Sequence, residues 1–232
     1  NGHDVLNKLE DSKKTTIALT TGLALGGGLE LALSCDYRIG TRKTQFRFPE
    51  TSIGIFPGLG GTQRPARIAG LPAARWAVLA GNFMDAKTAS DLGMVTDLVD
   101  VTEVDATILA LDSRGKPDVK YPAQPANPDS KIAKFAQAFY SDENLNTLLR
   151  GKCPDGFDME DKLVSRQMKS LSRTAPIALQ MASDLIDAAA TTDLYQGLSQ
   201  ELDNLEDIFS TNDALEGLSA LIEGRKPTYQ NS

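Results

Sequence analysis

Three consecutive glycines, Gly26 to Gly28, separate a β-branched segment from an apolar one and restrict the fold more than any other feature of this chain. Residues 15–20 before them combine threonine with apolar side chains, which is typical of a buried strand. Residues from about 28 to 35 favour a helix. A strand, a tight loop and a helix in succession indicate α/β architecture. A helix that opens at such a loop leaves backbone N–H groups bare, and together with the helix dipole they favour negative charge.

The alternation of short strands and helices continues through the first hundred residues. A second glycine-rich stretch, residues 53–61, leads into a helix that ends near Gly70. The other predicted elements of this part are listed here: helices over 4–12, 71–81 and 85–91, and strands over 37–41, 46–49 and 95–99.

Two glutamates flank the glycine run and are the candidate acid/base groups. Glu30 lies one helical turn beyond the glycines, among leucines and alanine, where a charge is costly unless it has a use. Glu50 follows Pro49 at the end of the strand predicted over 46–49. Two carboxyls placed on opposite sides of a developing oxyanion would form a general acid/base pair. Alone, the glycines would be read as a turn and Glu50 as a neighbour of a helix N-cap.

Composition excludes several classes of protein. A net charge of −7 argues against a nucleic-acid partner. The two cysteines, Cys35 and Cys153, lie far apart, so we expect a reducing compartment, a cytoplasmic location and no disulfide framework. His3 is the single histidine, which argues against a histidine-dependent triad or metal site. The sequence shows no signal peptide and no long apolar run, so no membrane partner is expected.

The remainder of the chain is predicted to be a loop followed by helices. Residues 112–130 hold four prolines and form a loop, and residues 132–149 have a helical pattern. The predicted C-terminal helices span 159–172, a segment opened by Pro176, 198–209, and 214–222 with a capping box in Ser210-Thr-Asn-Asp213. Apolar rows on two of them, which exceed what one subunit needs, predict an interface between subunits. These rows are Ile177, Met181 and Leu185, and Leu198, Leu202, Leu205 and Phe209.

Several ordered motifs resemble the crotonase family, the enoyl-CoA hydratase/isomerase superfamily. The resemblance is dense over the first hundred residues and looser over the last sixty. The residues that carry it are Gly22-Leu-Ala-Leu-Gly-Gly-Gly-Leu-Glu30, Cys35-Asp36-Tyr-Arg-Ile, Phe48-Pro49-Glu50, Gly54-Ile-Phe-Pro57-Gly58-Leu-Gly60-Gly61-Thr62-Gln63-Arg64, and Ile208 through Gly217 with Glu223-Gly-Arg225-Lys226-Pro227.

The resemblance implies a spiral of ββα units followed by C-terminal helices that assemble a trimer or a pair of trimers. It implies that the Gly27 N–H is one of two oxyanion-hole donors for a thioester carbonyl, and that Glu30 and Glu50 handle the water and the α-proton. Both glutamates together favour hydration of a 2-enoyl-CoA, as in fatty-acid β-oxidation, over isomerisation. No metal or redox cofactor is expected. Further substrate or CoA contacts are expected at Gly26, Phe48, Pro57, Gly58 and Lys226.

Two departures from the family pattern shape these expectations. The chain begins just before the strand that leads to the glycine loop, so we expect the N-terminal portion of the spiral, the second oxyanion donor and the adenine contact to be absent, and activity of the chain as given to be poor. Arg47-Phe48 replaces a usual Gly-Gln, which would give Glu50 an apolar wall that alters acyl specificity or raises the pKa of its carboxyl.

We therefore predict a spiral core over 1–100, an insertion or linker with a helix over 101–160, and a trimerisation region over 161–232. The insertion resembles the hydratase part of fused enzymes, so a fused or associated 3-hydroxyacyl-CoA dehydrogenase is a further expected partner. Two other hypotheses stay open: an enoyl-CoA isomerase or another enolate-forming enzyme, and an inactive module that only binds or oligomerises.

Overall fold

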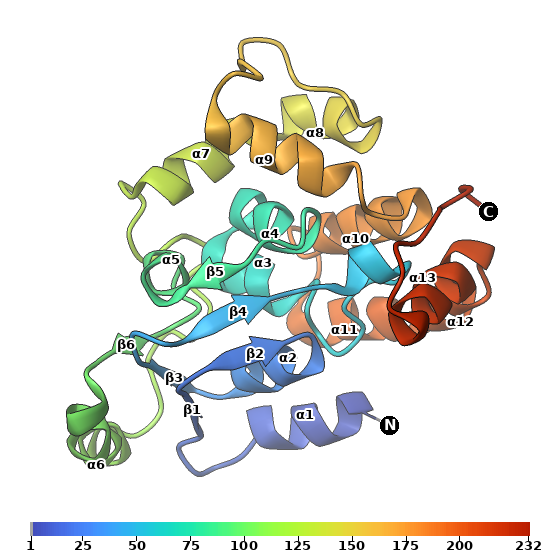
Figure 1. Ribbon diagram of the computed structural model, residues 1–232. Coiled ribbons are helices and arrows are strands. Elements are labelled where there is room, and N and C mark those ends of the chain that lie inside the picture. Colours follow the sequence, from blue (N-terminus) through green and yellow to red (C-terminus); the bar gives the residue numbers. More distant parts are fainter. Residues whose placement is uncertain (1) are drawn as a thin grey trace.

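Six short strands form two three-stranded sheets in the structure, a computed structural model that describes residues 2–232 (Figure 1). The first sheet is parallel, with spatial order β1 (Ile17–Thr20), β3 (Tyr37–Gly40) and β6 (Asp97–Leu98). The second has the order β2 (Leu23–Leu25), β4 (Gln45–Arg47) and β5 (Met84–Asp85), with β5 antiparallel to β4.

Each successive turn of the chain supplies one strand to the first sheet and one strand to the second. Ile17 pairs with Tyr37 in the first sheet and Leu23 pairs with Gln45 in the second, so the two sheets grow in step. The helix α2 (Gly27–Ser34) carries the chain from β2 back to β3. The predicted α/β class is confirmed. The short strand β2 was missed, because it is only three residues long and lies inside the stretch read as a glycine loop.

The helices of the first hundred residues pack around these sheets. They are α1 (Gly2–Glu10), the 3₁₀ turn η1 (Glu50–Ile53), α3 (Arg64–Ala69), α4 (Leu71–Val78) and α5 (Ala86–Asp91). The helix α4 begins with a proline in its first turn, as predicted. From Ala73 onward all of its residues are buried, so this helix lies at the centre of the hydrophobic core.

The region between residues 101 and 160 holds more helix than predicted. A 3₁₀ turn η2 (Val101–Glu103) leads into α6 (Val104–Arg114), which packs Val104 and Leu111 against Tyr37 and Ile39 of β3. The helix expected over 132–149 is two helices, α7 (Lys131–Phe139) and α8 (Asp142–Leu149), which are separated at Tyr140 and Ser141. The division of the chain at residues 100 and 160 stays a prediction.

Five helices form the C-terminal part of the chain. They are α9 (Lys162–Leu171), α10 (Pro176–Ala188), α11 (Leu194–Asp203), α12 (Leu205–Phe209) and α13 (Asn212–Glu223). The segment predicted as one helix over 198–209 is thus broken after Asp203. The N-cap of α13 is Thr211, whose Oγ1 accepts a hydrogen bond from the Ala214 N–H at 3.0 Å, so the predicted box from Ser210 to Asp213 was wrong in detail.

The first of the two apolar rows does not face outward. Leu185 is buried, and Ile177 and Met181 pack against the hydrophobic core, because α10 lies against α4. Of the second row, Leu202 and Phe209 are exposed. The surface available to another subunit is therefore smaller than the sequence pattern suggested.

A buried ionic cluster joins α1 to α3 and to the proline-rich loop. Glu10 Oε2 accepts from Arg64 Nε at 2.8 Å, and Glu10 Oε1 accepts from Lys120 Nζ at 2.7 Å. The Tyr121 hydroxyl also donates to Glu10. Because Arg64 is fully buried, Glu10 is needed to balance its charge. The cluster attaches α1 firmly to the spiral.

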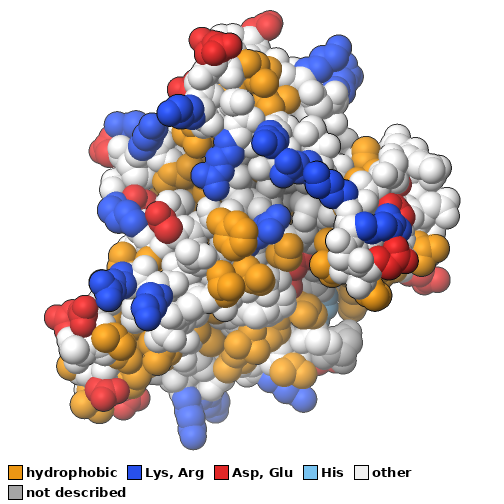
Figure 2. All heavy atoms as spheres, in the orientation of Figure 1, with side chains coloured by type: hydrophobic (Ala, Val, Ile, Leu, Met, Phe, Trp, Pro, Cys, Tyr) orange, Lys and Arg blue, Asp and Glu red, His pale blue; other side chains and the backbone are white. Residues whose placement is uncertain are grey.

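The strands β1 and β2 and the neighbouring helix α2 carry exposed apolar side chains. Leu19, Leu23, Leu25 and Leu31 are each at least 40% exposed, and Figure 2 shows hydrophobic side chains over this region in the lower half of the view. Among the helices described between residues 2 and 232, none has the combination of length and apolarity that crossing a bilayer requires.

Candidate active site

The glycine run forms the turn between β2 and α2. Gly26 has φ 49°, a left-handed conformation that glycine adopts at little cost. Its N–H donates to Arg47 O at 3.0 Å, and its carbonyl accepts from Leu29 N and Glu30 N at 2.8 and 3.0 Å. Gly27 and Gly28 are exposed in the first turn, where a helix supplies no intrahelical acceptor for the N–H groups. The loop therefore presents N–H donors to whatever binds beside it.

Glu30 lies in the first turn of α2 and points inward. The residue is 2% exposed, and its Oε1 accepts from the backbone N–H groups of Leu59 and Gly61 at 2.7 and 2.8 Å. Burial, followed by the nearby charges of Glu201 and Glu50, raises the pKa of Glu30 to about 8. The two N–H donors act in the opposite direction. The carboxyl is thus held in one orientation and readily keeps its proton near neutral pH.

Glu50 lies on the other side of the same glycine loop, at the start of the 3₁₀ turn η1. It is 8% exposed, and its Oε1 lies so close to Gly26 that a Cβ there would collide with it. Its Oε2 is buried and has no hydrogen-bond partner among the described residues. Burial raises the pKa of Glu50 to about 7, the Arg47 charge lowers it, and the Glu201 charge raises it. An unpartnered buried oxygen of this kind is available to a substrate.

Phe48 and Pro57 lie beneath the site rather than at its surface. Phe48 is fully buried, and a Cβ at Gly61 would lie 2.9 Å from its ring and 2.5 Å from Pro57 Cβ. Arg47 turns away: its Nε donates to Gly81 O at 2.7 Å, and its guanidinium lies over the Phe83 ring. The apolar wall expected from Arg47-Phe48 is therefore supplied by Phe48, next to the loop that holds Glu30.

The sequence that carries these carboxyls and glycines matches a known protein family. A model of the family described as enoyl-CoA hydratase/isomerase matches residues 2–232. The chain belongs to the enoyl-CoA hydratase/isomerase family. This membership confirms the resemblance to the crotonase superfamily.

Two curated relatives illustrate the family. The chain is 32% identical over 213 residues to the peroxisomal bifunctional enzyme of Danio rerio, covering 90% of this chain and 26% of that protein. It is 30% identical over 214 residues to the probable enoyl-CoA hydratase 2, mitochondrial, of Arabidopsis thaliana, covering 92% of this chain and 52% of that protein. The chain thus spans between a quarter and about half of the length of these relatives.

A solved structure shows the same fold. The enoyl-CoA hydratase from Rhodobacter sphaeroides superposes with a TM-score of 0.76 and 22% identity, over 99% of this chain and 67% of that chain. This similarity confirms the predicted family spiral.

Two residues expected to contact substrate in this family lie outside the group around the glycine loop. Gly58 packs against α12, where a Cβ would lie 2.6 Å from Leu205. Lys226 is exposed in the C-terminal tail and lines a separate cavity with Arg173 and Tyr229. Their roles in substrate binding stay predictions. No cluster of three or more His, Cys, Asp or Glu side chains suited to a metal ion occurs within residues 2–232.

A third buried carboxyl was missed by the sequence reasoning. Glu201 of α11 is fully buried and accepts from the backbone N–H groups of Gly60 and Thr62 and from the Thr62 hydroxyl. His3 Nε2 lies 3.1 Å from Glu201 Oε1. The available signal was position: Glu201 comes three residues after Leu198, on the same buried face of the helix.

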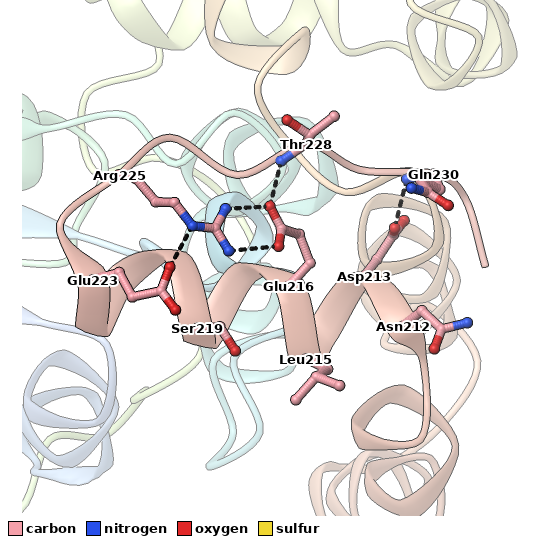
Figure 3. Close-up of a pocket in the computed structure, with 9 residues that line it drawn as sticks. All are labelled: Asn212, Asp213, Leu215, Glu216, Ser219, Glu223, Arg225, Thr228 and Gln230. Carbon is pink, nitrogen blue, oxygen red and sulfur yellow. Dashed lines mark hydrogen bonds and ion pairs between the residues drawn. The ribbon is translucent and has the colours of Figure 1, made fainter.

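The C-terminal tail is tied to α13 by ion pairs. Arg225 donates two hydrogen bonds to Glu216, of 2.6 and 2.8 Å, and one to Glu223, of 2.5 Å; Figure 3 shows these side chains together. The Thr228 N–H donates to Glu216 at 2.8 Å. The pKa of Glu216 is lowered to about 2, first by Arg225 and then by the Thr228 N–H. Glu216, Glu223 and Arg225, which line a pocket on the surface, thus already pair with one another.

The same tail supports the element that carries Glu50. Asp213 is buried and accepts from the N–H groups of Gln230 and Asn231 at 2.7 and 3.0 Å. These bonds place the Tyr229 hydroxyl where it donates to Ser52 O at 2.7 Å, within η1. The position of Glu50 therefore depends in part on the last residues of the chain.

Proposed function

We propose that the chain hydrates a 2-enoyl-CoA thioester to a 3-hydroxyacyl-CoA. The observation that carries this proposal is the pair of buried carboxyls, Glu30 and Glu50, on two sides of a loop in which Gly27 is exposed and lies in the first helical turn, where its N–H has no intrahelical acceptor. Burial raises the pKa of Glu30 to about 8 and that of Glu50 to about 7, so between about pH 7 and 8 the two together keep about one proton.

The proposed reaction uses one group for each developing charge. In the form of the pair whose single proton is on Glu50, the ionised Glu30 orients a water molecule and removes its proton as the oxygen bonds to the β-carbon. The electron pair of the double bond moves toward the thioester carbonyl, whose oxygen gains enolate charge. The Gly27 N–H, at the positive end of α2, donates to that oxygen. Glu50 then delivers a proton to the α-carbon, which completes the addition of water.

The names of the relatives support the substrate class. A hydration of this kind produces a 3-hydroxyacyl thioester, which a dehydrogenase of fatty-acid β-oxidation could oxidise. We propose a fused or associated 3-hydroxyacyl-CoA dehydrogenase on this ground, and because one relative is called bifunctional. The relatives' names include peroxisomal and mitochondrial, so the cytoplasmic location expected from the cysteines stays a prediction.

The direct test is hydration of crotonyl-CoA by the protein at its full natural length and by its variants. We expect Glu30→Gln and Glu50→Gln each to lower turnover by about 10²-fold or more, because each removes an acid/base group. Glu206→Gln, an exposed glutamate of α12, is the matched control and should keep the parent rate. Hydration at the parent rate by either active-site variant would exclude the proposal. Isomerisation of a 3-enoyl-CoA without hydration would favour the isomerase hypothesis.

We also propose assembly into a trimer or hexamer through the C-terminal helices. Their exposed apolar side chains support it: Leu202, Phe209, Leu215, Leu221 and Ile222. Side chains of this kind, gathered on neighbouring helices, are typical of a surface that another subunit covers.

A further inference from the structure

The loop of residues 59–62 lies between two buried glutamates that come from different parts of the chain. Glu30 reaches it from α2, and Glu201 reaches it from α11. Four consecutive backbone N–H groups are divided between the two carboxyls. Those of Leu59 and Gly61 donate to Glu30, and those of Gly60 and Thr62 donate to Glu201.

The contacts of Glu201 leave this carboxyl little freedom. Its Oε2 accepts from Thr62 N at 3.2 Å and from Thr62 Oγ1 at 2.5 Å, and its Oε1 accepts from Gly60 N. His3 Nε2 of α1 lies 3.1 Å from the same Oε1. Because the residue is fully buried, each of these bonds is made in a medium of low dielectric, where an unmet partner is costly.

The alternation of the N–H groups depends on Gly60. Its φ of +98° turns the chain so that neighbouring N–H groups point to opposite sides. A Cβ at this position would collide with the Arg64 guanidinium, whose Nη1 also donates to Leu59 O at 3.0 Å. The loop is therefore short, closely packed and held from both sides, so that movement of one carboxyl shifts the donors of the other.

We propose that Glu201 is a positioning residue for Glu30, and that it acts through the backbone of residues 59–62. Its hydrogen-bond partners, His3, Gly60 and Thr62, lie outside the glycine loop in the sequence. Its role is to keep the Leu59 and Gly61 N–H groups aimed at the Glu30 carboxyl. This inference rests on the proposed function, in which Glu30 acts on the water. It assigns a part in the site to α11, a helix far from the glycine loop in the sequence.

The first test needs no activity. Amide hydrogen exchange, followed by NMR, is compared in the parent chain, in Glu201→Gln and in Asp203→Asn. The last variant removes an exposed charge from the same helix. We expect exchange at Leu59 and Gly61 to rise by about tenfold in Glu201→Gln, as for one lost hydrogen bond, and to stay at the parent level in Asp203→Asn. Faster exchange confined to Gly60 and Thr62 would overturn the proposal.

A second, milder variant tests the proposal even if Glu201→Gln unfolds the protein. Thr62→Val has nearly the same shape as threonine and keeps both the Glu201 charge and the loop N–H groups, but removes the hydroxyl donor. We expect it to raise exchange at Leu59 and Gly61 in the same direction by a smaller factor. Parent-level exchange at both residues in this variant, with Glu201→Gln unfolded, would also overturn the proposal.

The second test is a double-mutant cycle on hydration. We expect Glu201→Gln to lower kcat by about tenfold or more with KM unchanged, because a misplaced carboxyl impairs chemistry more than binding. In the Glu30→Gln background the same change should have almost no effect, since the group it positions is gone. An equal loss in both backgrounds would show a merely structural role for Glu201. Full activity of Glu30→Gln alone would instead exclude the proposed function.

Discussion

At the scale of single residues, burial gives Glu30 and Glu50 the properties of acid/base groups. Within residues 2–232 neither makes an ion pair that would hold its carboxyl charged, and each is buried. The folded chain therefore favours the protonated forms, at a cost to stability once the protons are lost. Because the charge of Glu50 raises the pKa of Glu30, we expect the two carboxyls to titrate as a coupled pair, and the state with one proton is suited to reactions that need an acid and a base together.

This burial predicts a dependence of stability on pH. Both pKa values are raised from 4.5, to about 8 and about 7, so the folded chain binds more protons than the unfolded chain between these values. Their contribution to stability is fully present below about pH 4.5 and is lost as pH rises through about 7 to 8. We expect Glu30→Gln and Glu50→Gln to be more stable than the parent at about pH 8, by urea unfolding, with no such gain in Glu206→Gln. An equal decline in all four proteins between about pH 5 and 8 would contradict this.

At the scale of elements, the site depends on two loops that only glycine can form. Gly26 has a positive φ and gives Glu50 room, and Gly60 has a positive φ and divides the N–H groups of its loop. The second loop also joins α2, α11 and α1 through Glu30, Glu201 and His3. The candidate site is thus built on backbone geometry as much as on side chains.

Replacing Gly60 tests this dependence. We expect Gly60→Ala to lower the free energy of unfolding by about 1–3 kcal/mol or more, because alanine at this φ is strained and its Cβ would collide with Arg64. Gly28→Ala is the matched control, since it meets nothing within 4 Å in the first turn of a helix. It should be neutral or stabilising by about 0.5–1 kcal/mol. Chemical unfolding of both variants measures the difference, and equal stabilities would show that the loop is not strained by a side chain.

At the scale of the whole molecule, the ends of the chain support the two carboxyls. The C-terminal tail fixes η1 through the Tyr229–Ser52 hydrogen bond, and α1 contacts Glu201 through His3. The neighbouring helices α11 to α13 leave leucine, isoleucine and phenylalanine side chains exposed. If another subunit covers this apolar surface, assembly would also hold in place the helices that support the candidate site.

Light scattering tests the proposed assembly. We expect the chain to have about three or six times its single-chain mass at micromolar concentration, because an apolar surface of this kind is stabilised by burial. The double variant Leu221→Asp and Ile222→Asp should reduce it to a monomer. Leu109→Asp, on an equally exposed leucine of α6, is the matched control and should leave the mass unchanged. A monomeric parent chain would contradict the proposal.

The sequence by itself determined the α/β class and the helix that opens at the glycine run, and it offered Glu30 and Glu50 as candidate acid/base groups, which stays a prediction. These features are local: glycine permits a turn that other residues resist, and a glutamate among leucines must be buried or used. The helix α6 and the break between α7 and α8 were missed, because packing against β3 and the core overrides a weak local pattern there.

Only the tertiary structure decided which distant groups meet. Glu201 is far from Gly60 in the sequence, and nothing in the spacing of its helix reveals the loop that it binds. The row of Ile177, Met181 and Leu185 resembles an interface in sequence, yet it packs on the chain's own core. An apolar stripe shows that a helix face will be buried, but not what will bury it, because the hydrophobic effect has no direction.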